Sequence, residues 1–368
     1  MNKELVSDKQ AVSMIVLFIS GSTLMFDSAQ AAKEDVWLAI ILAFTAALIV
    51  SLIYGRILTL FPNKNLFQIC ILVFGRWAGS IFCFLYVFFS IHLASLVLVD
   101  YSEFMAIVAL NSTPKIVSMI CVMLLVIWIV KEGVVVCGRW CELFMVITFL
   151  LVFASLPLFI PHLNINNLRP FLYRGVSPVL QGALGAFAFP FGEIVIFMGI
   201  FNNFKREKSP YRIYRRGLVI GTVLIFASSV THMLVLGPEE MVRLYFPPYT
   251  AFQLIDIAHF LTRIEIVIAA GFLIGGFVKI VICLLACSSG ICEMFSVSNY
   301  KLIITPICIL TIIITISDFS SIMELLEWDL AVWHWWAPFY QVVLPITILI
   351  CAEIKARKRK KREDCIKV

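Results

Sequence analysis

The stretch that decides the fold is Gly185-Ala186-Phe187-Ala188-Phe189-Pro190-Phe191-Gly192-Glu193-Ile194-Val195-Ile196-Phe197. It lies within an apolar run from about Pro178 to Phe201, which is long enough to cross a bilayer as one helix. Pro190 has no backbone N–H to donate, and Gly192 accepts unwound backbone at little cost. The stretch therefore predicts a membrane-spanning helix that is interrupted near its middle.

Glu193 is the second unusual feature of this run. An ionisable side chain at mid-membrane is costly, which favours a ligand or ion site at the interruption. The alternative is a simple helix kink whose carboxylate closes an internal ion pair. Lys279 is the matching base: counted from Pro178 and Glu265, the two charges lie at a similar depth, roughly 21–23 Å along parallel helices. The sequence predicts that they pair, unless Lys279 extends alone towards the cytoplasm.

Composition places the whole chain in the membrane. Its 368 residues are 61% hydrophobic and 14% charged, with a mean hydropathy of +0.99. This excludes a large soluble domain and predicts an all-α integral membrane protein with a single polytopic domain, residues 1–368. The chain has no nucleotide-binding loop, metal-ligand cluster or nucleophile–base set. We therefore expect no enzyme activity, no cofactor, no metal and no nucleic-acid partner.

Hydropathy predicts ten transmembrane helices that divide into two halves, at about 11–160 and 178–353, followed by a basic cytoplasmic tail, 354–368. The predicted spans are 11–29, 36–60, 78–102, 116–131, 141–160, 178–203, 216–237, 265–288, 302–317 and 336–353.

Lysine and arginine placement predicts the orientation. Most of the 29 basic residues fall on one side, including the clusters Lys205–Arg216 and Lys355–Arg362. Cytoplasmic segments carry the excess of Lys and Arg, so both termini are predicted to be cytoplasmic. The basic tail could also bind anionic membrane lipid, although a topology anchor explains it equally well.

Two further segments are predicted to lie at the outer face. The loop 238–264 is apolar enough to pack over an outward vestibule. The tryptophans from Trp328 to Trp336 suggest a helix in the headgroup layer before the tenth span.

A five-plus-five division is typical of transporters built from an inverted repeat, whose binding site lies where corresponding helices are interrupted. The counterpart of the sixth span is the first, which carries the small polar cluster Ser20-Gly21-Ser22-Thr23 at mid-span. This cluster predicts a second interruption, although it also suits close helix packing.

Four pieces of the sequence resemble one family, the B subunits of bacterial spore germinant receptors, a permease branch of the amino acid–polyamine–organocation superfamily. The pieces are Ala32–Ala39, Phe61–Leu66, Asn167–Pro170 together with Phe187–Glu193, and Phe260–Glu265. The resemblance implies a LeuT-like fold with helices one and six broken. It also implies the spore inner membrane, A-type and lipoprotein C-type partner subunits, and a small-molecule germinant such as an amino acid.

The resemblance further implies a ligand pocket between spans one, three, six and eight. Carried onto this chain, the pocket residues are Gly21, Ser22, Thr23, His92, Tyr101, Phe187, Phe189, Pro190, Gly192, Glu193 and Lys279.

Three functions fit these features: a nutrient-sensing subunit, a proton- or cation-coupled amino acid transporter with Glu193 as carrier, and a scaffold with a vestigial pocket. A transporter needs a coupling site, and the sequence offers no clear second carboxylate beside Glu193. Asp27 and Asp100 are placed near outer helix ends. This favours the sensor.

Overall fold

The computed structural model describes residues 5–204, 210–255, 265–319 and 322–366. Within these residues the chain is helical, apart from one isolated parallel bridge between Val6 and Phe204. Residues 205–209 of the predicted basic cluster Lys205–Arg216, and most of the piece Phe260–Glu265, lie outside the described residues.

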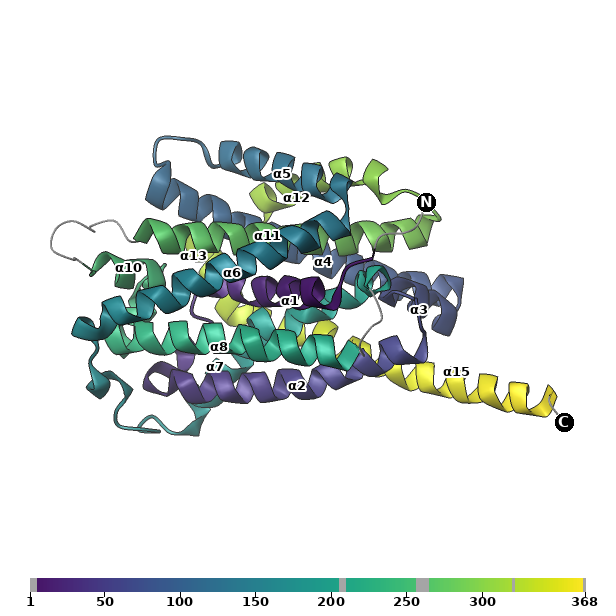
Figure 1. Ribbon diagram of the computed structural model, residues 1–368, viewed down its shortest axis with the longest axis horizontal. Coiled ribbons are helices and arrows are strands. Elements are labelled where there is room, and N and C mark those ends of the chain that lie inside the picture. Colours follow the sequence, from purple (N-terminus) through teal and green to yellow (C-terminus); the bar gives the residue numbers. More distant parts are fainter. Residues whose placement is uncertain (1–4, 205–209, 256–264, 320–321, 367–368) are drawn as a thin grey trace.

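The α-helices pack side by side along one long axis (Figure 1). Their bounds are α1 Asp8–Thr23, α2 Val36–Leu60, α3 Leu66–Phe74, α4 Arg76–Phe104, α5 Lys115–Glu132, α6 Val134–Phe159, α7 Val176–Ala186, α8 Pro210–Leu236, α9 Pro238–Arg243, α10 Pro247–Gln253, α11 Glu265–Phe295, α12 Ile304–Asp318, α13 Ile322–Trp328, α14 His334–Pro338 and α15 Leu344–Ile366. Short 3-10 or π segments connect or interrupt them: η1 Gln30–Asp35, η2 Met105–Ala109, η3 Ile160–His162, η4 Ile165–Leu168, η5 Phe187–Phe191, η6 Gly192–Gly199, η7 Phe201–Asn203, η8 Tyr300–Leu302, η9 Asp329–Trp333 and η10 Phe339–Val343.

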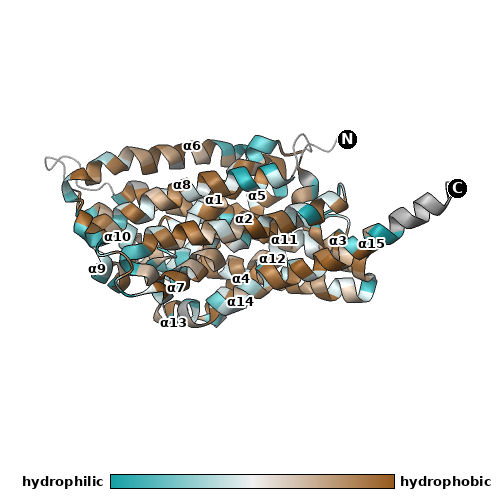
Figure 2. Ribbon diagram, turned by 90° about the horizontal axis from the view of Figure 1, so that it is seen from below, coloured by the Kyte–Doolittle hydropathy of each residue, from teal (hydrophilic) through white to brown (hydrophobic). Residues whose placement is uncertain are grey.

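The centre of the bundle is α1, which packs on α6, α8 and α11. Every residue of α1 from Ala11 to Thr23 is buried. The peripheral helices instead expose large apolar side chains, for example Leu52 of α2 and Leu150 of α6. Apolar residues cover the lengths of the helices, and polar residues gather towards their ends (Figure 2). This pattern is that of a multi-pass membrane protein, whose outer helices face lipid.

Among the described residues, seven helices are long and apolar enough to cross a membrane, and Ile304–Asp318 is a shorter apolar helix. The prediction of ten crossings also needs α1, which has 16 residues, and α5, which carries charged residues at both ends.

We use the name cavity end for the end of the bundle that carries η1, α9, α10 and α13. The described chain begins and ends at the opposite end, where α15 continues beyond the other helices (Figure 1). The basic tail therefore extends the last helix. The segments α13, η9, α14, η10 and α15 follow one another without a break, and Trp333 is buried, so Trp328–Trp336 continues directly into the last apolar helix. Its position in the headgroup layer stays a prediction.

The interruption expected at Ser20–Thr23 is misplaced. The α-helix continues through this cluster and ends at Thr23, and residues 24–29 form turns and irregular backbone before η1. Gly21 instead serves close packing: a Cβ there would lie 2.5 Å from the backbone carbon of Gly275 in α11. The absence of a side chain at both positions lets the two helices touch backbone to backbone.

Candidate functional site

The backbone leaves the α-helical conformation inside the Pro190 stretch. α7 ends at Ala186, Phe189 adopts φ −142° and ψ 112°, and a 3-10 helix resumes at Gly192. Such a segment frees carbonyl groups that need partners in hydrocarbon. The carbonyl of Ala188 accepts hydrogen bonds from the Gln341 amide, at 2.8 Å, and from the Trp333 indole, at 3.3 Å.

Gln341 also explains why residue 192 is glycine. A Cβ on Gly192 would lie 2.2 Å from Oε1 of Gln341. Gln341 belongs to η10, where the π geometry leaves its own carbonyl free to accept a 2.6 Å hydrogen bond from Tyr54 of α2. Side chains of η9 and η10 therefore satisfy the carbonyl group freed in η5, and Tyr54 of α2 satisfies the backbone carbonyl of Gln341.

Glu193 follows directly after this irregular segment and is fully buried. Its Oε2 lies 2.6 Å from Nζ of Lys279 in α11, which is fully buried as well. The predicted pair therefore forms. Nζ also lies 4.3 Å from the ring centroid of Phe189 and 5.4 Å from that of Phe18, so aromatic faces surround the ammonium group. Oε1 of Glu193 has no hydrogen-bond partner among the described residues.

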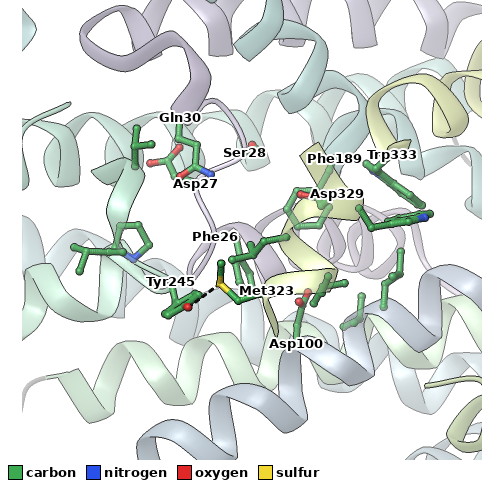
Figure 3. Close-up of a pocket in the computed structure, with 18 of the residues that line it drawn as sticks. Phe26, Asp27, Ser28, Gln30, Asp100, Phe189, Tyr245, Met323, Asp329 and Trp333 are labelled. Carbon is green, nitrogen blue, oxygen red and sulfur yellow. Dashed lines mark hydrogen bonds between the residues drawn. The ribbon is translucent and has the colours of Figure 1, made fainter. Parts of the chain in front are cut away.

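A cavity of about 260 Å³ borders this pair, and Figure 3 shows part of its lining. Phe189 and Glu193, from the interrupted helix, line it. The other lining residues are Phe26, Asp27, Ser28, Gln30, Leu93, Leu96, Val97, Asp100, Val242, Arg243, Leu244, Tyr245, Pro247, Met323, Leu325, Leu326, Trp328, Asp329 and Trp333.

The cavity gathers carboxylates that are far apart in the sequence. Asp27 comes from the link between α1 and η1, Asp100 from α4 and Asp329 from η9, and all three face the same cavity as Glu193 (Figure 3). The expectation that Glu193 has no other carboxylate in its site is therefore wrong. Asp27 and Asp100 do lie towards helix ends, but the packing of α1 against α11 and of α4 against α11 brings them into one space.

The mouth of the cavity is formed by the loop predicted to cap it. Val242, Arg243 and Leu244 line the cavity from the α9–α10 segment. Tyr245 crosses the opening and donates a 2.9 Å hydrogen bond to Sδ of Met323 (Figure 3). The described part of the loop thus lies at the opening, and its residues 256–264 are outside the described residues.

The remaining predicted pocket residues take different positions. Gly21, Ser22, Thr23, Phe187, Pro190 and Gly192 are buried and do not line the cavity. His92 packs against Trp328 and Trp336 and pairs with Asp318, at 3.5 Å. Tyr101 lines a separate apolar groove between α4, α5, α6 and α11.

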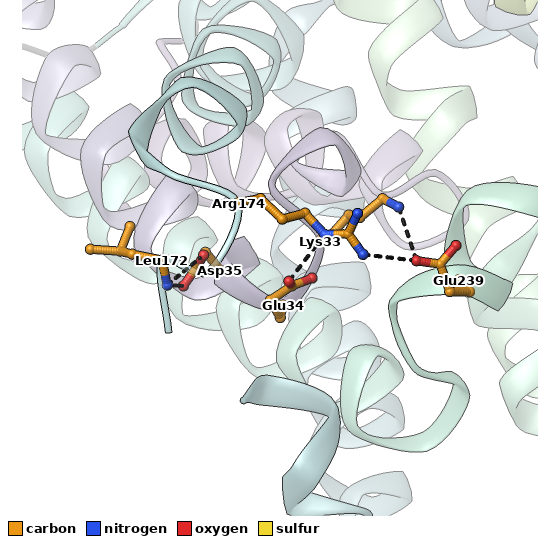
Figure 4. A network of polar contacts seen from close by, with 6 residues as sticks. All are labelled: Lys33, Glu34, Asp35, Leu172, Arg174 and Glu239. Atoms are coloured by element: carbon orange, nitrogen blue, oxygen red, sulfur yellow. Dashed lines mark hydrogen bonds and ion pairs between the residues drawn. The ribbon is translucent and has the colours of Figure 1, made fainter. Parts of the chain in front are cut away.

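A polar network ties together the cavity-end connections (Figure 4). Arg174, just before α7, contacts Glu34 of η1 at 3.1 Å and Glu239 of α9 at 2.9 Å. Lys33 contacts Glu239 at 3.1 Å. The hydrogen bond from Lys33, with the charges of Lys33 and Arg174, lowers the pKa of Glu239. The piece Ala32–Ala39 thus supplies contacts that join three separate links of the chain.

Sequence reasoning missed the residues that support the irregular backbone, Tyr54, Trp333 and Gln341. A glutamine inside an apolar span is a usable signal, because a buried amide needs partners. Tyr54 and Trp333 give no such signal, since aromatic residues occur throughout membrane spans. The role of Asp329 was missed because Trp328–Trp336 was assigned to the headgroup layer.

Comparison with known proteins gives a consistent match. Residues 5–321 match the family described as spore germination protein. The chain is 28% identical over 369 residues to Spore germination protein KB of Bacillus subtilis (strain 168), with 98% of both chains covered. It is 24% identical over 336 residues to the putative spore germination protein YfkT of the same organism, with 89% of both covered.

Solved structures share the fold. Mhp1, a nucleobase-cation-symport-1 family transporter in a closed conformation with bromovinylhydantoin bound, matches with a TM-score of 0.62, 11% identity and coverage of 96% of this chain and 92% of that chain. MhsT in complex with L-phenylalanine matches with a TM-score of 0.53, 13% identity and coverage of 95% and 99%. At these identities the likeness establishes the fold and not the function.

Proposed function

Because the chain belongs to the spore germination protein family, we propose that it is the membrane-spanning, nutrient-sensing subunit of a spore germinant receptor. The family match over residues 5–321 is the observation that carries this proposal. The transporter-like fold supports it, since such a fold can hold a small molecule and change state when the molecule binds.

The proposed architecture is a LeuT-like arrangement of ten crossings, with α1, α5 and α12 counted beside the seven longer helices. The first and sixth crossings are the interrupted ones, at residues 24–29 and at Phe189. Both termini are proposed to lie on the cytoplasmic side of the spore inner membrane. This agrees with the basic tail, and with the observation that the described chain begins and ends at the same end of the bundle. The cavity then opens to the outer side.

The proposed germinant pocket is this cavity, which borders the Glu193–Lys279 pair. Phe189 lies between the two, because its ring lines the cavity and also contacts the ammonium group of Lys279. The nutrient is an amino acid or a similar small molecule. By contacting this ring, it can favour one conformation of the irregular backbone over another. Such a shift requires that the two states bind the nutrient unequally.

The resemblance to germinant receptor B subunits supports partners of the A type and of the lipoprotein C type. We place their response downstream of the cavity: the nutrient changes the state of this chain, and the partner subunits transmit the change. The basic extension of α15 is proposed to contact anionic lipid at the cytoplasmic surface.

A second candidate function is coupled transport. It is favoured by the fold, which is shared with a nucleobase-cation-symport-1 family transporter, and by a buried charged pair that could carry a proton or cation. Purified protein in liposomes separates the two functions. Sustained uptake of the germinant driven by an ion gradient would establish transport, whereas binding without uptake supports the sensor.

The proposal is tested in spores of the host organism. We expect deletion of the gene to abolish or reduce germination in response to at least one nutrient mixture, and a plasmid copy to restore it. Germination by nutrient-independent triggers should stay unchanged. Normal responses of the deletion strain to every nutrient mixture would contradict the proposal.

A further inference from the structure

Carboxylates outnumber cations in the lining of the cavity. Among the described lining residues, Arg243 has the one positively charged side chain. It lies at the mouth, its side chain is 72% exposed, and Glu240 is 3.8 Å away. The acidic lining residues are Asp27, Asp100, Glu193 and Asp329. The described lining therefore holds four acidic side chains and one basic side chain.

Three of these carboxylates already have basic neighbours. Glu193 pairs with Lys279. Asp329 lies within electrostatic range of His334, and Asp100 within electrostatic range of Lys279. This leaves Asp27 as the carboxylate available to a ligand.

Asp27 is 5% exposed, and no basic side chain pairs with its carboxylate among the described residues. The Ser229 hydroxyl and the Ala29 N–H are the polar groups that lie close to it. Burying a carboxylate without a partner is costly, so this group fits a site whose partner arrives with a ligand. Asp100 faces the same space from α4 (Figure 3).

The rest of the lining also suits a positive charge. Aromatic faces attract cations, and the ammonium group of Lys279 already lies over one of them, Phe189. The aromatic lining residues are Phe26, Phe189, Tyr245, Trp328 and Trp333. α1 ends at Thr23, just before the first lining residue, so the partial negative charge of its C-terminus lies nearby.

From these contacts we propose, building on the germinant-receptor assignment, that the cavity selects a small organic ammonium compound whose ammonium group is held by Asp27. The ammonium group is the feature that is recognised. A carboxylate on the ligand is not required, because the described part of the cavity offers it no buried, unpaired cation. The aromatic lining favours an organic ammonium over a bare metal ion, since the organic group also gains apolar contact.

The test uses the full chain in lipid nanodiscs and four probes at pH 7 and equal concentration: benzylammonium chloride, sodium benzoate, potassium chloride, and benzyl alcohol in potassium chloride. Because a ligand of the native state raises the unfolding temperature, we expect benzylammonium chloride to give a shift at least about twofold larger than any other probe. An equal or larger shift with potassium chloride would identify a metal-ion site and overturn the proposal. An equal or larger shift with benzoate or benzyl alcohol would also overturn it.

Variants then locate the site. Asp27→Asn should raise the benzylammonium concentration needed for half of the shift by about tenfold, because it removes the charged partner of the ammonium group. Glu240→Gln is the matched control, since it removes an acidic group at the same end outside the cavity lining. An unchanged concentration in Asp27→Asn would contradict the assignment, and the comparison of probes on the unmodified chain stands even if the variant fails to fold.

The two proposals can fail separately. Normal germination of the deletion strain would remove the receptor function whatever the probes do. A deletion strain that loses its nutrient response, combined with no preference for benzylammonium, would keep the receptor function and remove only the ligand class.

Discussion

Oε2 of Glu193 and Nζ of Lys279 lie 2.6 Å apart, and both side chains are fully buried. The two residues belong to η6 and α11, 86 positions apart by number, so the pair joins the irregular sixth span to the long eighth one. In a medium of low dielectric each charge is tolerated because the other is present.

Removing one partner of this pair should cost more than removing both. Glu193→Gln and Lys279→Met should each lower the free energy of unfolding by about 3–5 kcal/mol, because each leaves an uncompensated charge or an unpaired polar group. The double variant should be milder than the sum of the single variants. A double-mutant cycle in detergent measures this coupling, and simple additivity would rule out direct interaction.

The contact between α1 and α11 predicts a strict requirement for glycine. Gly21→Val should lower the unfolding free energy by about 1–3 kcal/mol or more, because its Cβ would lie 2.5 Å from the Gly275 backbone. Gly271→Ala in α11 is the control: its nearest neighbours would be 3.7 Å away, an ordinary contact. Thermal unfolding of both purified variants checks the prediction. A Gly21→Val protein as stable as the unmodified chain would show that the helices do not touch there.

The cavity-end network predicts a pH-dependent contribution from Glu239. Its pKa is lowered in the folded state by the hydrogen bond from Lys33, with a contribution from Arg174, so its stabilising effect is present above the unfolded pKa, near 4.5. The effect is lost as the pH falls through the lowered folded value. Glu239→Gln should therefore reduce the melting temperature by roughly 1–2 °C at pH 7, and this difference should shrink below about pH 4.5.

Glu240→Gln is again the control for this measurement, because Glu240 adjoins Glu239 and, among the described residues, forms its ion pair with Arg243 outside the network. A Glu239→Gln difference that persists unchanged in acid would mean that the network acts through packing and not through charge.

The proposed orientation predicts which positions an impermeant reagent reaches. In a background without native cysteines, a cysteine at Glu240 should react with an external maleimide on intact cells, and one at Lys358 should not. Both positions are exposed in the structure, so burial does not explain a difference. Reaction at Lys358 before permeabilisation would reverse the orientation.

Local chemistry made the sixth span predictable. Pro190 and Gly192 within one apolar run indicate interrupted backbone, and Phe189 is indeed non-helical. The depth of Glu193 and Lys279 was also predictable, because helix rise is constant and the two spans run in parallel.

Properties that depend on a distant partner were not predictable in the same way. The sequence Ser20–Thr23 fits either a helix interruption or a surface for close helix packing. Only the position of Gly275 in the structure distinguishes the two. From the sequence, Asp27 and Asp100 are predicted to be polar residues near helix ends. Only the packing of the helices places them in the lining of one cavity. A single sequence gives the depth of a residue better than the direction in which it faces.

The central claim is that this cavity is where the nutrient acts, and filling the cavity tests it most directly. Leu96→Trp places a larger side chain at a lining position, and Leu150→Trp places the same side chain on the exposed face of α6 as the control. The measurement is the nutrient concentration for half-maximal loss of spore refractility, at equal amounts of protein in the membrane. We expect Leu96→Trp to abolish the response or raise that concentration by at least about tenfold, because the filled cavity no longer admits the nutrient, while Leu150→Trp responds normally. An unchanged concentration in Leu96→Trp spores would contradict the account.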